Sequence, residues 1–217
     1  MESDLNPPVE MRDAATAEGM IDRLQPVVVG IGGSAGAIPA LLSLLEALDN
    51  DAPLAIVVVL HLSPDHQSSA AEILQRVTPL KVSQVTSRTL LQAGHVYVIA
   101  PGTNLVTADG HVQPASVPSK RPSAVIDLFF RTLAEVYGAR AVGVVVSGTG
   151  SDGSLGLSQI NEMGGLTLAQ SPEDAEHGDM PRAAIGTGTV DLVLPASGIG
   201  ARLVELTRFQ RASQDAS

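Results

Sequence analysis

The sequence predicts an α/β fold: a doubly wound, mainly parallel β-sheet sandwiched between helices, with an antiparallel β-hairpin at one edge. Apolar residues make up 44% of the 217 residues, which is enough to fill a core of this kind. Short, nearly continuous aliphatic runs, typical of strands buried on both faces of a parallel sheet, alternate with amphipathic stretches typical of helices. This alternation favours right-handed crossovers between parallel strands.

Each strand is predicted from its β-branched and aliphatic composition. In chain order, these runs are Val27–Val29, Leu54–Leu60, Ala141–Val146, Leu166–Ala169 and Val190–Leu194. The stretches between them predict helices over 37–48, 66–76, 123–137, 154–163 and 196–208. Residues 80–115 interrupt the alternation with two short runs, Val96–Ile99 and Asn104–Thr107, and then Asp109-Gly110, a pair typical of a hairpin turn. We expect an antiparallel addition at a sheet edge there.

Composition predicts one domain with two polar tails. Residues 1–24 hold six acids against two arginines and lack a strong apolar period, so we expect an acidic, flexible N-terminal tail. Residues 25–208 form the predicted folded domain, and residues 209–217 a polar C-terminal tail.

Charge and residue usage exclude several function classes. The formal net charge of −10 argues against a nucleic-acid partner, because a duplex binder needs a basic face. The absence of cysteine removes disulfides, thiolate nucleophiles and cysteine-ligated metals. No apolar run approaches the roughly 18–20 residues that span a membrane, and the N-terminus lacks the pattern of a signal peptide. We therefore expect a cytoplasmic protein with no membrane insertion.

The glycine-rich turn after the first strand is the most informative segment. Residues 32–36, Gly-Gly-Ser-Ala-Gly, match the nucleophile elbow Gly-x-Ser-x-Gly, in which small neighbours let a sharp turn present the serine hydroxyl. Two alternatives stay open: Ser34 is also a suitable helix N-cap, and Gly30 and Gly32 fit part of a dinucleotide-binding fingerprint. The nucleotide interpretation is the weaker one, because the second strand ends at His61 and not at an acid that would bind a ribose.

A base and an acid for Ser34 follow two other buried strands. His61 comes directly after the second strand, and Asp152 lies in the glycine-rich turn after the third. Because parallel strands end at the same sheet edge, these side chains are predicted to meet as a Ser-His-Asp triad. The alternatives are a buried, hydrogen-bonded histidine and an N-cap aspartate. The chain order Ser, His, Asp differs from that of α/β-hydrolases and predicts another fold.

The same turns provide candidate oxyanion donors. We predict that the backbone N–H groups of Ala35, Thr149 and Gly150 stabilise an oxyanion. No residues have the spacing of a metal site, so neither a metal nor a cofactor is predicted. Of the remaining histidines, His66 is expected to be exposed in the first turn of a helix. The others are expected in a turn, the hairpin and a polar loop; they are His95, His111 and His177.

Six sequence blocks, in order, resemble the catalytic domain of the bacterial chemotaxis protein-glutamate methylesterases, the CheB family. The resemblance covers about residues 26–207 and includes Ser34, His61 and Asp152. The blocks are residues 30–36, 60–64, 94–102, 121–123, 147–153 and 178–185.

The resemblance implies a serine hydrolase that demethylates glutamate γ-methyl esters on chemoreceptor-like proteins through an acyl-enzyme. In this family the serine is the nucleophile, the histidine the base and the aspartate its partner, and many members also deamidate glutamines. The implied partner is a methylated chemoreceptor or a similar signalling protein. The family's usual receiver domain has no counterpart in this sequence, so the chain looks like the domain of methylesterase–methyltransferase fusions. A methyltransferase domain in the same full-length polypeptide is then a further expected partner.

The resemblance also places Arg121, Met180 and Arg182 in loops near the cleft, as candidates for substrate binding. Positive charge there would favour a glutamate-rich substrate. Surface ion pairs are the alternative for the arginines, and the alternative for Met180 is that it caps the last crossover. Two rival functions also stay open: a non-catalytic docking or regulatory module of a methylesterase–methyltransferase protein, and a Rossmann-like nucleotide-binding module.

Overall fold

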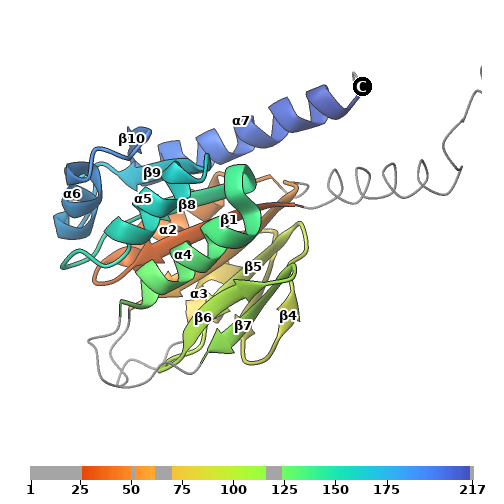
Figure 1. Cartoon of the computed structure of the whole chain (residues 1–217), viewed down its shortest axis with the longest axis horizontal. Coiled ribbons are helices and arrows are strands. Elements are labelled where there is room, and N and C mark those ends of the chain that lie inside the picture. Colours follow the sequence, from red (N-terminus) through yellow and green to blue (C-terminus); the bar gives the residue numbers. More distant parts are fainter. Residues whose placement is uncertain (1–25, 50–51, 62–69, 116–123, 216–217) are drawn as a thin grey trace, which may run out of the picture.

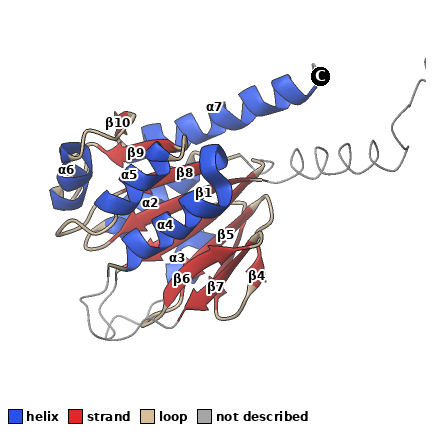
Figure 2. Ribbon diagram, viewed as in Figure 1, coloured by secondary structure: helices blue, strands red, loops and turns tan. Residues whose placement is uncertain are grey.

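The computed structural model describes residues 26–49, 52–61, 70–115 and 124–215, with the side chains of 209–215 left out. Within these residues, a seven-stranded sheet in the order β10-β9-β8-β1-β2-β5-β3 is parallel throughout, which confirms the predicted fold class (Figures 1 and 2). Its strands are β1 (Val27–Gly33), β2 (Leu54–Leu60), β3 (Lys81–Val85), β5 (His95–Ile99), β8 (Ala141–Val145), β9 (Leu166–Gln170) and β10 (Leu192–Leu194).

Helices cover both faces of this sheet (Figure 2). Helices α4 and α5 pack together on one face, and α2 packs with α3 and α7 on the other. The bounds of the helices are α2 (Ala37–Glu46), α3 (Ala70–Gln75), α4 (Val125–Tyr137), α5 (Ser154–Glu162), α6 (Asp179–Gly186) and α7 (Ala196–Asp215), with a short 3-10 turn η1 (Gly138–Arg140). The two central strands β1 and β2 are buried at every position, as their continuous apolar sequences predict.

The region 80–115 differs in part from the expectation. The run around Val96 is not part of the antiparallel addition, because β5 lies between β2 and β3 as a parallel strand of the main sheet. The predicted hairpin is present as β6 (Asn104–Ala108) and β7 (His111–Ala115), and β4 (Thr89–Leu90) completes a separate three-stranded antiparallel sheet. Asp109 and Gly110 both have positive φ angles, 48° and 75°, as a type I′ hairpin turn requires.

Close helix packing explains two glycines of β1. A Cβ atom at Gly30 would lie 2.9 Å from Phe129 of α4, and one at Gly32 would lie 2.3 Å from Ile126. These glycines are therefore strand residues that let α4 approach the sheet, and α4 side chains fill the space beside them. This packing removes the main sequence support for a dinucleotide-binding turn, in which glycines instead leave room for a pyrophosphate.

Two helices differ from the sequence-based expectation. Helix α6 was not predicted, and it carries Pro181 in its first turn, where a helix tolerates a missing N–H group. Helix α7 was predicted over 196–208 and continues to Asp215. The proposed N-terminal tail, residues 1–24, lies outside the described residues.

Candidate active site

Three predicted side chains lie at one edge of the sheet because their strands are neighbours. β1 lies between β2 and β8, so Ser34, His61 and the turn that holds Asp152 follow three adjacent strands. Main-chain bonds continue the sheet pattern past the strand ends: the N–H of His61 donates to the carbonyl of Gly33 at 3.0 Å. Parallel topology thus brings together residues that are more than 100 positions apart in the chain.

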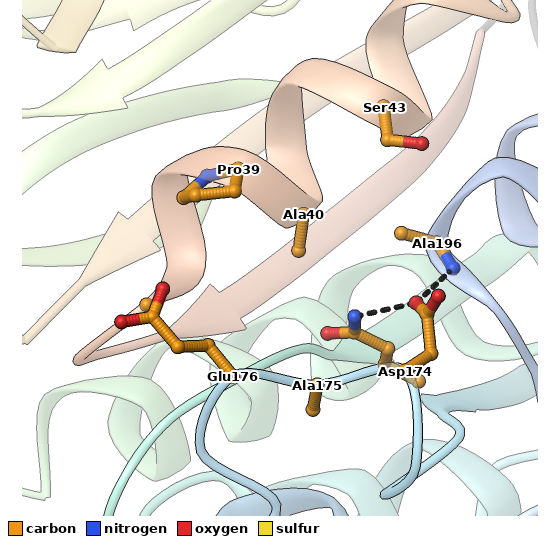
Figure 3. Close-up of a pocket in the computed structure, with 9 residues that line it drawn as sticks. Pro39, Ala40, Ser43, Asp174, Ala175, Glu176 and Ala196 are labelled. Carbon is orange, nitrogen blue, oxygen red and sulfur yellow. Dashed lines mark hydrogen bonds between the residues drawn. The ribbon is translucent and has the colours of Figure 1, made fainter.

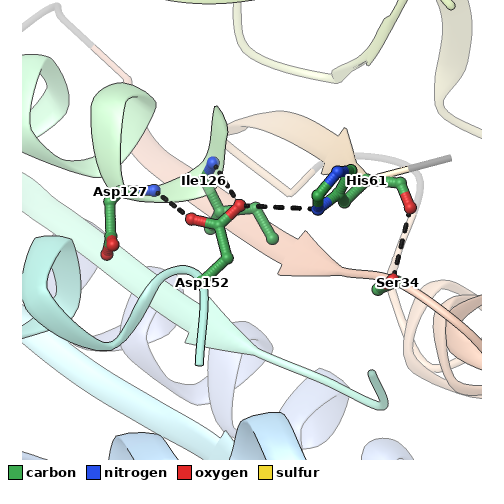
Figure 4. Close-up of polar contacts among 5 residues, drawn as sticks. All are labelled: Ser34, His61, Ile126, Asp127 and Asp152. Carbon is green, nitrogen blue, oxygen red and sulfur yellow. Dashed lines mark hydrogen bonds and ion pairs between the residues drawn. The ribbon is translucent and has the colours of Figure 1, made fainter. Parts of the chain in front are cut away.

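Ser34 lies half-buried in the sharp turn between β1 and α2. Gly36 closes this turn with a φ of 70°, a conformation that glycine adopts without strain, and α2 begins at the next residue. The Ser34 hydroxyl donates a hydrogen bond to the backbone carbonyl of His61 at 3.2 Å (Figure 4). It makes no side-chain cap on α2, so the N-cap interpretation of Ser34 is not what the structure shows.

The imidazole of His61 faces the carboxylate of Asp152. His61 Nδ1 lies 3.9 Å from Asp152 Oδ2, and the side chains are 48% and 13% exposed, respectively (Figure 4). With Nδ1 toward the carboxylate, the tautomer protonated at Nδ1 leaves Nε2 as the basic ring nitrogen. The ring is accessible to a substrate, while its acidic partner is mostly shielded from water.

Asp152 also accepts two backbone hydrogen bonds from the first turn of α4. The N–H of Ile126 donates to Oδ2 at 3.1 Å and that of Asp127 to Oδ1 at 3.0 Å. Burial raises the pKa of the Asp152 carboxyl above its ordinary value of 3.8; the two N–H groups and His61 oppose the rise, and Asp127 adds to it. Asp152 therefore does act as a helix cap, but for α4 and not for the helix that follows it.

The predicted oxyanion donors have no hydrogen-bond acceptor in the part of the chain that the structure describes. Among the residues that the structure describes, none accepts a hydrogen bond from the N–H of Ala35, Thr149 or Gly150. All three residues are exposed. Gly148, the neighbour of Thr149, lies against the nucleophile turn, since a Cβ atom there would be 3.0 Å from Ser34 Cβ.

The structure describes two of the three substrate-binding candidates, one buried and one exposed. Arg121 lies outside the described residues. Met180 is only 1% exposed, because its side chain packs beside Gly148; this corrects the expectation that it offers apolar surface to a substrate. Arg182 is 62% exposed and pairs with Asp179 at 3.6 Å, the surface ion pair considered as its alternative.

The other histidines have local contacts, apart from His66, which the structure does not describe. His95 stacks on Tyr97, His111 Nδ1 lies 2.7 Å from the Asp109 carbonyl, and His177 lies beside Glu176. Across the described ranges, no three His, Asp or Glu side chains group as metal ligands would. No helix in those ranges is long and apolar enough to cross a membrane.

Sequence reasoning missed the residues that support the triad. Two of them are Asp127, whose carboxylate accepts the N–H of Gly156 in α5, and Ser147, whose hydroxyl donates to the Ala35 carbonyl in the nucleophile turn. A signal for Ser147 was present, since it follows a buried strand just as Ser34 does. Its partners in the loop after β9 carried no recognisable pattern.

The family model described as CheB methylesterase matches residues 29–203, most of the chain. The chain belongs to the CheB methylesterase family. It is also similar to the crystal structure of the Thermotoga maritima CheB methylesterase catalytic domain, with a TM-score of 0.74 and 31% sequence identity. That similarity covers 83% of this chain and 98% of the other, so the likeness extends over the whole catalytic domain.

Curated relatives carry consistent names. The Myxococcus xanthus protein-glutamate methylesterase/protein-glutamine glutaminase 1 is 35% identical over 86% of this chain, and a putative Leptospira interrogans enzyme of the same kind is 33% identical over 84%. The chain spans 55% of the Myxococcus protein and 94% of the Leptospira protein. It therefore spans about half the length of several relatives that it matches.

Proposed function

We propose that this CheB-family domain is a protein-glutamate methylesterase that acts on γ-methyl esters of chemoreceptor-like proteins. The observation that carries the proposal is the juxtaposition of Ser34, His61 and Asp152 at the ends of three adjacent strands. The names of the curated relatives support the same reaction.

In the first half-reaction, Ser34 is the nucleophile and His61 the general base. The Ser34 hydroxyl turns from the His61 carbonyl toward Nε2, which takes its proton as Oγ attacks the ester carbonyl carbon. Asp152 holds the protonated imidazole through Nδ1. The tetrahedral intermediate collapses, His61 returns the proton to the leaving methoxide oxygen, and methanol departs to leave an acyl-enzyme.

In the second half-reaction, water replaces methanol. His61 takes a proton from water, the resulting hydroxide attacks the acyl-enzyme, and the proton returns to Ser34 as free glutamate is released. Backbone N–H groups of Ala35, Thr149 and Gly150, which have no described acceptor, are suited to stabilise both oxyanions. One such donor is typically worth about 3–4 kcal/mol of the barrier.

Glutamine deamidation is a second candidate activity of the same site, favoured by the glutaminase in the names of the relatives. An amide carbonyl would follow the same steps with ammonia as the leaving group. The rival hypothesis is a docking module that has the same fold but hydrolyses no ester. The experiment below distinguishes it from the methylesterase. We also propose that the domain works beside a methyltransferase in a longer polypeptide. Its proposed location is the cytoplasm.

The decisive experiment measures methanol release from a methylated chemoreceptor cytoplasmic fragment. We expect release by the wild type, a loss of at least 1,000-fold in Ser34→Ala and His61→Ala, and a smaller loss in Asp152→Ala. Ser43→Ala, on the helix that follows Ser34, and His111→Ala, in the second sheet, serve as matched controls and should keep wild-type rates.

Each result has a clear meaning. Receptor binding without hydrolysis by folded wild type, unchanged in Ser34→Ala, would establish the docking module instead. Full activity in His61→Ala would remove His61 as the base. Ammonia release from a glutamine-containing fragment, measured in parallel, decides whether deamidation accompanies demethylation.

A further inference from the structure

Ser147 is a wholly buried serine directly behind the nucleophile turn, with every polar group engaged. It lies just after β8 and is 0% exposed. Its N–H donates to the side-chain oxygen of Gln170 at 2.9 Å, and its carbonyl accepts from the N–H of Ser34 at 3.0 Å. Its hydroxyl donates to the carbonyl of Ala35 and accepts from the N–H of His177, both at 2.9 Å.

These bonds hold the nucleophile turn at two points on either side of the Ser34 side chain. The main chain of Ser147 fixes the N–H of Ser34, and its hydroxyl fixes the carbonyl of the next residue, Ala35. The hydroxyl also fills the space next to Gly36, where a Cβ atom would lie 2.7 Å from Ser147 Oγ. The direction of the Ser34 side chain depends on both peptide groups that this serine contacts.

On its other side, Ser147 is anchored to rigid elements. The N–H of Gly148 donates to the His177 carbonyl at 2.9 Å, which pins the loop that precedes α6. Gln170 Nε2 donates to Asp174 Oδ2 at 2.7 Å, and the same carboxylate accepts from the N–H of Ala196, the first residue of α7 (Figure 3). A pocket of about 260 Å³ lies beside these groups, lined also by Gly36, so the anchoring chain runs along its wall.

We propose that Ser147 is a positioning residue for Ser34: its hydroxyl holds the nucleophile turn against the loop after β9. The inference rests on the proposed function. Because Ser147 is buried, it acts through Ser34 and contacts no substrate. Its loss leaves the N–H of His177 and the carbonyl of Ala35 without their partner, and the turn gains freedom. A displacement of the nucleophile by about 1 Å is enough to reduce turnover strongly.

The test compares Ser147→Ala with Ser147→Cys and a matched control. Ser158→Ala removes a serine hydroxyl of α5 that donates to the Ser154 carbonyl and bonds to the hydroxyl of Thr189, which lies between α6 and β10. Two rates are measured: methanol release, with kcat and KM separated, and covalent labelling of Ser34 by a fluorophosphonate. The labelling needs no knowledge of the natural substrate.

We expect Ser147→Ala to lower kcat and the labelling rate by about 10- to 100-fold with KM changed less than twofold. Ser147→Cys, similar in size and a weak hydrogen-bonding group, should recover part of the rate. Both rates of Ser158→Ala should stay within twofold of wild type, although this variant loses about as much thermal stability as Ser147→Ala.

The outcomes separate this inference from the function on which it rests. Wild-type labelling without methanol release would overturn the proposed substrate, while slower labelling in Ser147→Ala would still support the positioning role. The positioning role would be overturned if the labelling rate of folded Ser147→Ala stayed within twofold of wild type. It would also be overturned if Ser147→Ala and Ser158→Ala lost the labelling rate equally. No labelling of folded wild type would overturn both. If Ser147→Ala does not fold, the labelling rate of Ser147→Cys decides by the same criterion.

Discussion

Asp127 and Asp152 cap each other's helices. Asp152, in the turn before α5, accepts the backbone N–H groups of Ile126 and Asp127 at the start of α4. Asp127 in turn accepts the N–H of Gly156 in the first turn of α5 at 2.8 Å. Each carboxylate therefore stabilises the positive end of the neighbouring helix, and the proposed catalytic acid is held by the fold itself.

Removal of the Asp127 carboxylate should destabilise the fold at the start of α5. We expect Asp127→Ala to lower the free energy of unfolding by about 1–2 kcal/mol, because the N–H of Gly156 loses its acceptor. Urea denaturation measures this change. Glu162→Ala, at the exposed end of α5, is the control and should change stability by less than about 0.5 kcal/mol. Equal losses in the two variants would contradict the capping role.

The raised pKa of Asp152 predicts a pH dependence of stability. As pH rises from about 3.5, the carboxyl ionises first in the unfolded chain, near 3.8, while the folded protein keeps its proton. The unfolded state is thereby favoured, so this group's contribution to stability falls until pH passes the folded pKa and then stays constant.

The Asp152→Asn variant has no carboxyl at this position, so its comparison with wild type isolates the contribution of the Asp152 titration to stability. The unfolding free energy of wild type minus that of Asp152→Asn, measured by urea denaturation from pH 3.5 to 7, should decrease with pH and then level off. An increase over the same range would mean that hydrogen bonds to the ionised carboxylate outweigh its burial.

Gly148 should tolerate no side chain. A Cβ atom there would lie 2.0 Å from Met180 Sδ and 3.0 Å from Ser34 Cβ, so Gly148→Ala forces the turn away from the nucleophile. We expect a loss of about 1–3 kcal/mol in stability and at least tenfold in methanol release. In Gly186→Ala of α6, the new atom meets nothing within 4 Å, so both quantities should stay near wild type. Wild-type turnover in Gly148→Ala would contradict the close packing of Gly148 against Met180 and Ser34.

Tyr97 is predicted to affect stability without affecting catalysis. Its hydroxyl donates to the Leu90 carbonyl at 2.9 Å and accepts from the N–H of Gln92 at 3.0 Å, and burial raises its pKa. Tyr97→Phe leaves both backbone groups unpaired and should cost about 1–3 kcal/mol in thermal or urea unfolding. Methanol release should stay within twofold, since the lost hydroxyl bonds to the backbone of Leu90 and Gln92 and to no triad residue; a larger drop would show coupling to the site.

The sequence predicted strands well where both faces are buried and poorly at the sheet edge. β1 and β2 are apolar throughout, so their runs were recognisable. β3, with the sequence KVSQV, lies at the edge and is largely accessible, so it carries no continuous apolar run. β3 pairs in parallel with β5, so β5, which we expected in the antiparallel addition, belongs to the parallel sheet.

By itself, the sequence determined the alternating α/β pattern, the Asp-Gly hairpin and the three strand ends that carry Ser34, His61 and Asp152. These are local features, because hydrophobic period and turn chemistry act over a few residues. Only the tertiary structure decided that Asp152 caps α4, that Met180 is buried and that Ser147 joins the nucleophile turn to the loop after β9. Such contacts join segments far apart in the chain, and their partners are chosen by packing and by the need of buried polar groups for hydrogen bonds.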